Sequence, residues 1–565
     1  MRRWCLWAIL AVTLVSNQVS AQQLKPIWQD VHVSVGEVTP SDCVQLPVIT
    51  WGGEYETVFA NGNEKRTKSG SLFAQAGLCF DITLQDDFRQ QFKDYMSGKT
   101  PYLRGTLDMI NAVTEATKSD PRVQPVVVLL LTRSTGGDAV VVTEGIKTAA
   151  DFKGKRVALQ AYGPHMYYLW RILKSVNLSV SDVKLVWTDD LTASDKTAAE
   201  ALRRGQADVA FAIIPDALAL SSNGTVGTGA EGSVKGARIL LSTKSADHVI
   251  FDVFAVRSDY FNAHKETVYA FAQTMLRAGQ DMAAVVKAGK QEYRDLVKAF
   301  AKIILGSDKA VEDAGAMYAD CTFSDIGENQ RFFSGAGARR SFREVVADIQ
   351  SAFRDLGLMA ATVALTHAEW DYSLMGSGAK LQILAEKPLF DEERVAAVVD
   401  TRLRTGTLDS DQILPTSSIF FEPNQIDFSA ARYQDEYDQI IAQAAVLGGA
   451  VIVIEGNADP MGYLRKKKAG DPQVILTQVR QVAKSLTVQR SMTVRDSIIQ
   501  YAASKGVTLD PTQFTVVGHG FEQPRSGMCG ADPCAPKTEQ QWRENMRVDF
   551  RLISMEAEAS AFKPL

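Results

Sequence analysis

Residues 151–173 read DFKGKRVALQAYGPHMYYLWRIL, and this stretch decides the fold class of the N-terminal part. A charged turn leads into residues 156–160, whose apolar centre at 157–159 predicts a buried strand, and a loop of small residues then leads into a helix. The strand-like runs 183–187 and 207–212 follow, with a helical pattern at 198–205 between them. Strands that alternate with helices predict an α/β architecture.

The same alternation precedes this stretch. A β-rich run at 44–51 ends at two glycines, a second strand is expected at 80–84, and helices are expected at 87–96 and 106–117. The apolar run 124–132 has no polar alternation, as expected of a strand that is buried on both faces. The return strand is expected at 250–256, and helical spacing of apolar residues then predicts helices at 266–287, 292–304, 309–318 and 342–356.

The segment from 150 to 216 resembles the periplasmic substrate-binding proteins of ABC transporters, in the type 2 group of nitrate, sulfonate and taurine binders. Those proteins share the Lys-Gly-Lys turn, the strand, the small-residue loop and the helix, followed by a segment like Ala207-Asp208-Val209-Ala210. The resemblance is spread over about 35–380. It implies a two-lobed α/β domain at 30–375, with the second lobe at about 135–245, that closes on a solute and delivers it to an ABC permease.

The resemblance also implies that loops at the carboxyl ends of the strands hold the solute. Helix N-termini there offer unpaired backbone donors, so a small anion or a zwitterion is the expected ligand. The candidate ligand-binding residues of the two lobes are Trp51, Gly52, Gly53, Glu54, Ser71, Arg104, Thr106, Tyr162, Gly163, His165 and Asp216.

Several of these residues also have a purely structural interpretation. The two glycines fit a tight turn between strand and helix, and the tryptophan fits core packing. Arg104 can hold an oxyanion through a two-pronged contact, but a salt bridge with Glu54 or Asp108 explains its charge equally well. A lone histidine such as His165 is more often a structural residue than a ligand.

The C-terminal part carries a second ordered set of motifs. They are a Phe-x-x-Asn segment that ends at Asn424, the run Ile454–Asp459, the helix start at 486–491 and a terminal Asn-Met-Arg-Val-Asp at 545–549. This order resembles the OmpA-like peptidoglycan-associating domain. It implies a smaller α+β domain of β-α-β-α-β order at 416–556, joined to the first domain by a linker at 376–415.

In that family an aspartate and an arginine grip the amine and the carboxylate of diaminopimelate in the stem peptide. Asp459 and Arg490 match these two positions, and Asn424 and Arg547 complete the candidate peptidoglycan-binding residues. A zwitterion needs one fixed anion and one fixed cation on a rigid frame, which this pair supplies. The alternative is that the two side chains only pair with each other.

The C-terminal part also departs from the family pattern. The usual His-Thr before the aspartate is Asn457-Ala458, and an expected asparagine is Ala483. An insertion at 463–485 contains four consecutive basic residues, 465–468. A solvated flap is favoured over a basic surface that approaches wall polymers. Wall affinity is therefore expected to be weakened or altered.

The first residues indicate export. Two arginines precede the apolar run 4–15 and a small-residue site that ends at Ala21, which predicts a signal peptide at 1–21 and a periplasmic, wall-associated protein. Five cysteines follow, and an oxidising compartment permits disulfides. Cys529 and Cys534 flank a short turn and form the favoured pair, Cys43 and Cys79 form a weaker one, and an odd number leaves one cysteine unpaired.

The remaining features argue against other classes of function. A net charge of -5 argues against nucleic-acid binding. No Cys-x-x-Cys motif or histidine cluster indicates a metal, and no cofactor is expected. No nucleophile with an adjacent base indicates an enzyme. The leading prediction is a solute-binding protein, and the alternative is an envelope sensor or a structural scaffold built on the same two-lobed frame.

Overall fold

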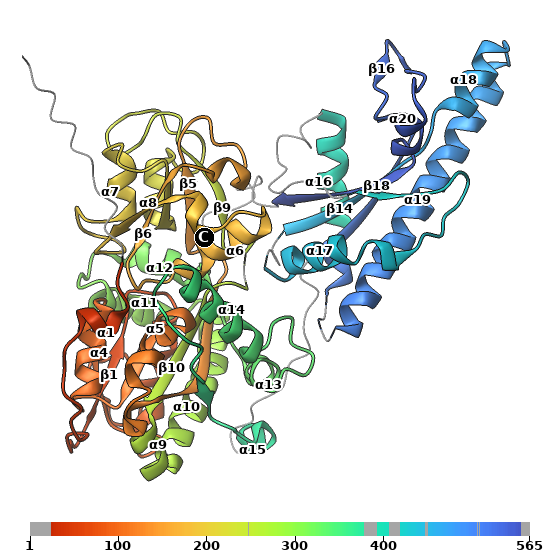
Figure 1. Cartoon of the computed structure of the whole chain (residues 1–565). Coiled ribbons are helices and arrows are strands. Elements are labelled where there is room, and N and C mark those ends of the chain that lie inside the picture. Colours follow the sequence, from red (N-terminus) through yellow and green to blue (C-terminus); the bar gives the residue numbers. More distant parts are fainter. Residues whose placement is uncertain are drawn as a thin grey trace, which may run out of the picture.

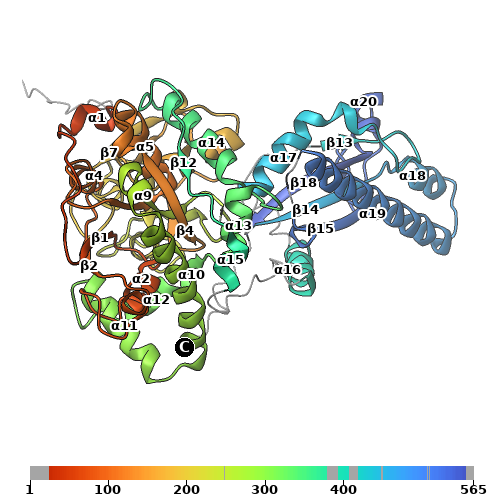
Figure 2. The ribbon, with the colours of Figure 1, turned by 90° about the horizontal axis from the view of Figure 1, so that it is seen from below.

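The computed structural model describes residues 24–246, 248–377, 392–405, 418–446, 450–505, 507 and 509–554. The N-terminal part consists of two α/β lobes, and the C-terminal part is a separate module that lies beside them (Figures 1 and 2). The predicted signal peptide and most of the predicted linker lie outside the described residues. Within those residues, no helix combines the length and the apolar character that a membrane crossing requires.

Lobe one is built on a mixed sheet in the order β11-β4-β10-β3, and β12 pairs in parallel with β4. Nearly every residue of β4 is buried, as its unbroken apolar run predicted. The parallel pair β1–β2 lies against β3. The strands are β1 (Val44–Val48), β2 (Phe80–Leu84), β3 (Tyr102–Thr106), β4 (Pro125–Ser134), β10 (Phe251–Arg257), β11 (Cys321–Phe323) and β12 (Thr366–His367).

The helices of this lobe carry an apolar face toward the sheet. In α14 the buried residues Phe342, Val345, Ile349 and Phe353 recur at helical spacing. This helix packs against α5 of lobe one and also against α6 of lobe two. The helices are α1 (Ile27–Asp30), α2 (Glu54–Ala60), α3 (Leu72–Gln75), α4 (Phe88–Met96), α5 (Leu107–Thr117), α9 (Ser258–Ala263), α10 (Lys265–Ala288), α11 (Gln291–Ile304), α12 (Val311–Ala319), α13 (Ile326–Ser334), α14 (Phe342–Asp355) and α15 (Tyr372–Ser377).

Lobe two has a five-stranded sheet in the order β7-β6-β8-β5-β9. Strand β6 is parallel to both of its neighbours, while β5 is antiparallel to β8 and β9. The chain enters this lobe between β4 and β5 and leaves it between β9 and β10, so two segments join the lobes. The elements are β5 (Asp138–Val142), β6 (Arg156–Gln160), α6 (Met166–Ser175), β7 (Lys184–Thr188), α7 (Ala198–Arg203), β8 (Val209–Ile213), α8 (Ile214–Leu220) and β9 (Arg238–Ser242).

The C-terminal module has a four-stranded sheet in the order β13-β18-β14-β15. Helix α19 packs closely on β14 and β15 because two glycines leave room for it. A Cβ on Gly456 would lie 2.2 Å from the carbonyl oxygen of Thr487, and one on Gly518 would lie 2.5 Å from Val488. The elements are α16 (Glu392–Thr405), β13 (Ser418–Phe420), α17 (Gln434–Val446), β14 (Ala450–Asn457), α18 (Met461–Lys468), α19 (Gln473–Ser504), β15 (Phe514–Gly520), β16 (Met528–Cys529), β17 (Asp532–Pro533), α20 (Glu539–Glu544) and β18 (Arg547–Ser554).

The insertion of the C-terminal module is not a flap, which corrects the expectation from the sequence. Helix α18 and the first turns of α19 occupy it, so α19 begins at Gln473 rather than near Thr487. The cause is a small apolar cluster of Tyr463, Leu476 and Phe521, each at most 5% exposed. This cluster gives the inserted residues a core of their own.

The two parts of the chain contact each other through helices α6 and α17. Arg171 on α6 donates to the carbonyl oxygen of Ala442 at 3.0 Å, and Gln443 donates to the carbonyl oxygen of Ser175 at 3.3 Å. A cavity of about 330 Å³ lies between the same helices. An ion pair of 3.0 Å between Arg339 and Asp510 adds a second contact.

Disulfides join Cys43 to Cys79 and Cys529 to Cys534, the two pairs that the spacing favoured. The first ties the start of β1 to the start of β2. The second closes the loop that carries β16 and β17. Cys321 is a free, buried thiol, and burial raises its pKa well above the usual value.

Candidate functional site

The first candidate site is the crevice where the two lobes meet. Trp51 follows β1 and donates from its indole nitrogen to the Thr132 hydroxyl at 3.1 Å. Its ring also covers Gly137 in the first connection between the lobes, because a Cβ at Gly137 would lie 2.3 Å from the ring. Gly52 and Gly53 pack against the carbonyl oxygen of Met317 and the Thr132 side chain. These residues shape the joint between the lobes.

Arg104 is held between two carboxylates and has no exposed surface. Its guanidinium lies 2.7 Å from a carboxylate oxygen of Glu54 and 2.9 Å from one of Asp252. Burial alone would lower the pKa of Arg104, but the two carboxylates raise it above the usual value. Burial raises the pKa of Glu54 and of Asp252, against the opposing effect of Arg104. The salt-bridge alternative for Arg104 therefore describes this structure, and its Nη2 nitrogen is buried without a hydrogen-bond partner.

A second polar cluster lies on the lobe-two side of the crevice. His165 precedes α6 and contacts a carboxylate oxygen of Asp138 through Nε2 at 2.7 Å. The other carboxylate oxygen of Asp138 accepts from Ser134 at 2.6 Å, and Ser134 also contacts the Thr243 hydroxyl at 2.7 Å. Ser134 and Thr243 lie on the two connecting segments. The cluster therefore links both connections to the start of α6.

Asp108 connects the two lobes across the crevice. It lies in the first turn of α5, where it accepts from the Thr106 hydroxyl. Burial raises the pKa of Asp108 to about 6, and nearby His165 and the backbone of Tyr167 oppose that rise. Both of these opposing groups belong to lobe two, so lobe one and lobe two are in contact here. One carboxylate oxygen of Asp108 is buried without a hydrogen-bond partner.

Tyr162 and Gly163, from the predicted lobe-two loop, turn toward different neighbours. The Tyr162 hydroxyl donates to Asp30 at 2.7 Å, and the Arg89 guanidinium lies 4.7 Å from the ring centre. Tyr162 thereby ties the N-terminal segment and α4 to lobe two. Gly163 lies against the Gln160 side chain, where a Cβ would be 2.3 Å from the amide oxygen.

Two other predicted residues lie away from the buried network. Ser71 caps α3 by accepting from the backbone of Ala74 at 3.3 Å, close to the start of β2. Because the crevice lies at the opposite ends of the strands, Ser71 does not reach it, which corrects the prediction. Asp216 lies in the first turn of α8; burial raises its pKa, and a hydrogen bond from Thr192 opposes this.

Sequence reasoning missed the two aspartates that organise the crevice, Asp138 and Asp252. Each is at most 4% exposed and lies where a segment joins the two lobes. The signal was present, since Asp252 interrupts the apolar run from Ile250 to Val256 and Asp138 opens the apolar strand β5. A lone carboxylate in such a run needs a partner. The identity of that partner depends on the tertiary fold, because Arg104 is 148 residues away from Asp252 in the sequence.

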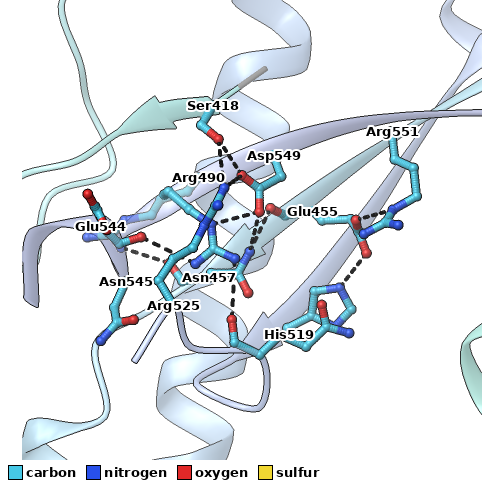
Figure 3. Close-up of polar contacts among 12 residues, drawn as sticks. Ser418, Glu455, Asn457, Arg490, His519, Arg525, Glu544, Asn545, Asp549 and Arg551 are labelled. Atoms are coloured by element: carbon cyan, nitrogen blue, oxygen red, sulfur yellow. Dashed lines mark hydrogen bonds and ion pairs between the residues drawn. The ribbon is translucent and has the colours of Figure 1, made fainter. Parts of the chain in front are cut away.

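The second candidate site is in the C-terminal module, where charged residues cover part of one sheet face (Figure 3). Glu455 on β14 contacts His519 at 2.7 Å and Arg551 at 2.8 Å. The hydrogen bond and the charges of these two partners lower the pKa of Glu455, although burial alone would raise it. Arg547 pairs with Asp549 at 2.7 Å. Arg547 is thus occupied within the sheet, and its expected contact with peptidoglycan is not seen in this arrangement.

Arg490 and Asp459 do not pair with each other in the described residues. The Arg490 guanidinium donates to three backbone carbonyls, those of Glu422, Gln425 and Asn457, at 2.7–3.4 Å. Burial lowers the pKa of Arg490 to about 10. Asp459 accepts from the backbone of Met461 at 3.0 Å, and burial raises its pKa. The exposed Asn424 sits at the turn of the 422–425 loop with a φ of 61°.

The other carboxylate oxygen of Asp459 is buried without a hydrogen-bond partner. Among the described residues, no carboxylate lies within ion-pair distance of Arg490. Among these residues Arg490 thus has no carboxylate partner and Asp459 has no ion-pair partner, and Trp542, Asn545 and the charge of Arg465 oppose the rise in the pKa of Asp459. Within the same residues, no group of three or more His, Cys, Asp and Glu could hold a metal ion.

The comparisons with known proteins concern the two lobes. Residues 68–285 match the family model described as NMT1/THI5 like, which spans parts of both lobes but less than half of the chain. Among curated proteins, none matches the sequence. The alkanesulfonate-binding protein SsuA from Xanthomonas axonopodis pv. citri, solved with MOPS, is 18% identical with a TM-score of 0.39; the alignment covers 58% of this chain and 100% of that one.

Two further solved structures align over the same part of the chain. The aliphatic sulphonate-binding protein SsuA from Escherichia coli is 16% identical, with 57% and 96% of the two chains covered and a TM-score of 0.40. The desulfurization enzyme DSZB is 17% identical, with 57% and 95% covered and a TM-score of 0.37. The family-model match and the two-lobed topology support a periplasmic-binding-protein-like α/β fold for the N-terminal part.

Proposed function

We propose that the chain is a periplasmic solute-binding protein that is held at peptidoglycan by its C-terminal module and serves an ABC permease. Two lobes joined by two segments form a frame that opens and closes around a solute. The polar network of Arg104, Asp108, Asp138, His165 and Asp252 marks the place where that solute is enclosed. Binding without turnover is the proposed activity.

The charge balance of the crevice selects between the two expected ligand classes. Arg104 already pairs with Glu54 and Asp252, so an anion would have to compete with two bound carboxylates for it. Asp108, Asp138 and Asp320 add three further acidic groups, against His165 and Lys244. A ligand with a cationic amine, in a zwitterion rather than a simple anion, is therefore the proposed solute. The occupation of Arg104 by two carboxylates carries this conclusion.

A thermal-shift screen with matched variants tests the ligand class. Amino acids, amine-bearing sulfonates and simple oxyanions are each added to the parent protein, to Asp108→Asn and to a control, Asp216→Asn. A ligand at about 100 times its Kd stabilises the fold by about 2.7 kcal/mol, a readily measured shift. We expect amine-bearing ligands to raise the Tm of the parent and of the control but not of Asp108→Asn. A shift with nitrate or sulfate that all three proteins share would contradict the proposal.

The burial of the junction between the lobes is the observation that favours the second candidate, a non-transport sensor or scaffold. Arg104, His165 and Asp252 are each at most 2% exposed. A scaffold would keep this arrangement permanently. Small-angle scattering with and without a stabilising ligand separates the two, because a receptor changes its radius of gyration and a scaffold does not.

The proposal for the C-terminal module rests on these two charged side chains, which have no ion-pair partner among the described residues. Arg490 holds the 422–425 loop through its carbonyls, and Asp459 has a free oxygen at the end of β14. A stem-peptide amine would complete the contacts of Asp459, and a carboxylate would neutralise Arg490. Co-sedimentation with purified sacculi should retain the parent and lose Asp459→Ala and Arg490→Ala. An exposed control, Asp496→Ala on the same helix α19, should be retained. Equal retention of all four proteins would remove this site.

A further inference from the structure

The inserted helices of the C-terminal module form a projecting basic arm. We define the arm as residues 461–486, which are α18 and the first turns of α19, together with the loop at 528–533 that carries β16 and β17. In Figure 1 these segments extend beyond the end of the sheet. Residues 461–486 contain six basic side chains and one acidic one, whereas the whole chain has a net charge of -5. Positive charge is therefore concentrated here against the overall balance.

The arm is a built structure rather than a solvated loop. The Arg480 guanidinium lies over the ring of Tyr463, 4.4 Å from its centre, and over Phe521 at 5.6 Å. The Tyr463 hydroxyl accepts from Arg480 at 2.6 Å and donates to Asp532 at 2.8 Å. Lys467 also pairs with Asp532. These contacts fix α18, α19 and the disulfide-closed loop to one another, which a purely solubilising charge run does not require.

Three basic side chains of the arm remain without a partner. Lys466 pairs with Asp471 at 3.3 Å, and Lys467 and Arg480 surround Asp532. Among the described residues, no carboxylate pairs with the three remaining exposed cations. These are Arg465, Lys468 and Lys484.

The arm continues directly from the proposed wall-binding site. Asp459 lies two residues before α18 and accepts a hydrogen bond from its first residue, Met461. The charge of Arg465 is felt at Asp459, where it opposes the rise in pKa that burial causes. Lys484 and Arg490 lie on the same helix, less than two turns apart. A polymer bound at Asp459 and Arg490 would thus pass close to the unpaired cations.

We propose that the arm is a second contact surface for the anionic peptidoglycan polymer. Arg465, Lys468 and Lys484 attract the free carboxylates of the stem peptides that neighbour the stem peptide bound at Asp459. The inference rests on the proposed wall binding and adds a sequence-independent electrostatic component to it. Exposed charges act over about 30 Å at 0.01 M salt and about 8 Å at 0.15 M salt. The arm's contribution should therefore be largest at low ionic strength.

Co-sedimentation of the full chain with sacculi over a salt series tests the proposal. The arm variant is Arg465→Gln, Lys468→Gln and Lys484→Gln, and the control removes three exposed lysines of the N-terminal part. The control substitutions are Lys290→Gln, Lys302→Gln and Lys309→Gln.

We expect the arm variant to lose about tenfold in affinity near 0.01 M salt and to match the parent near 0.3 M, because screening removes the difference. The control variant should follow the parent at every salt concentration. Thermal unfolding of all three proteins should coincide, since none of the replaced side chains has a partner.

Each other outcome bears on a different part of the reasoning. If the arm variant binds sacculi like the parent at low salt, while Asp459→Ala does not bind, the arm proposal is overturned and the wall site stands. If Asp459→Ala binds sacculi normally and the arm variant does not, the arm is a contact surface for peptidoglycan and the proposed site at Asp459 and Arg490 is wrong. If the parent ignores sacculi but sediments with anionic phospholipid vesicles through the arm, the partner is a lipid surface and the proposal is wrong.

Discussion

Replacement of Arg104 by methionine is the perturbation that most directly tests the buried network. Glu54 and Arg104 have no exposed surface, and Asp252 is 2% exposed. Arg104→Met fills similar space but leaves two carboxylates in the interior without their cation. Removal of one partner of a buried ion pair costs about 3–5 kcal/mol. We expect a loss of that size in the free energy of unfolding of the two lobes.

The pH dependence of that loss has a definite sign. Without Arg104, the pKa values of Glu54 and Asp252, which burial already raises, should rise further. A carboxylate with a raised pKa in the fold stabilises it below the unfolded pKa, and this stability is lost as the pH rises through the folded pKa. The destabilisation by Arg104→Met should therefore be smaller near about pH 5 than near about pH 8.

Urea unfolding followed by tryptophan emission provides the assay. Trp51 donates to Thr132, and Thr132 donates to Asp252 at 3.1 Å, so the indole reports on the network itself. A triple variant, Glu54→Gln, Arg104→Met and Asp252→Asn, removes all three charges and should recover most of the loss. A cost below about 1 kcal/mol for Arg104→Met alone, the range of an exposed ion pair, would refute the reasoning.

Three further predictions concern single positions. Burial raises the pKa of Asp108 from 3.8 to about 6, so the fold loses stability as the pH rises between those values. Asp108→Asn should therefore increase the free energy of unfolding by up to about 3 kcal/mol near about pH 8 and by little near about pH 4, as denaturation series at several pH values can show. Gly137→Val should displace the Trp51 ring, cost about 1–3 kcal/mol and shift the emission maximum; an unchanged spectrum would contradict the packing. Replacing Cys529 and Cys534 by serine should speed proteolysis between 525 and 535 and leave the thermal transition of the lobes unchanged, as calorimetry can show.

The strands were more predictable than the site. The runs 156–160, 183–187 and 207–212 became strands β6, β7 and β8 with ends shifted by at most two residues. Apolar periodicity is a local property, and β6 and β8 are central strands buried on both faces, whereas β7 is a half-buried edge strand. Helix α19 begins 14 residues before the predicted start at Thr487, because the Leu486-Thr487 motif shows where the helix begins in the family and not where it begins in this chain.

The contacts of the candidate residues are with partners that lie far away in the sequence, so the sequence alone cannot identify them. The loops after the strands are predicted to line a ligand site because the carboxyl ends of neighbouring strands meet at one edge of a sheet, and that role stays a prediction. Arg104 was named as an anion ligand or a salt-bridge partner of Glu54, and only the fold adds Asp252 from a strand 148 residues away. Ser71 belongs to a loop that is expected to hold the ligand, but in the fold it caps α3 at the start of β2.

Helix α6 has its two ends in different parts of the molecule. Its first residues lie at the crevice beside Asp108, and its last residue, Ser175, receives a hydrogen bond from Gln443 of the C-terminal module. Ten residues of helix make a rigid rod about 15 Å long. A hinge motion of the second lobe must therefore either slide this rod along α17 or swing the whole C-terminal module with it. In the proposed function, closure of the lobes on a solute would therefore also move the C-terminal module or shift its contact with α6.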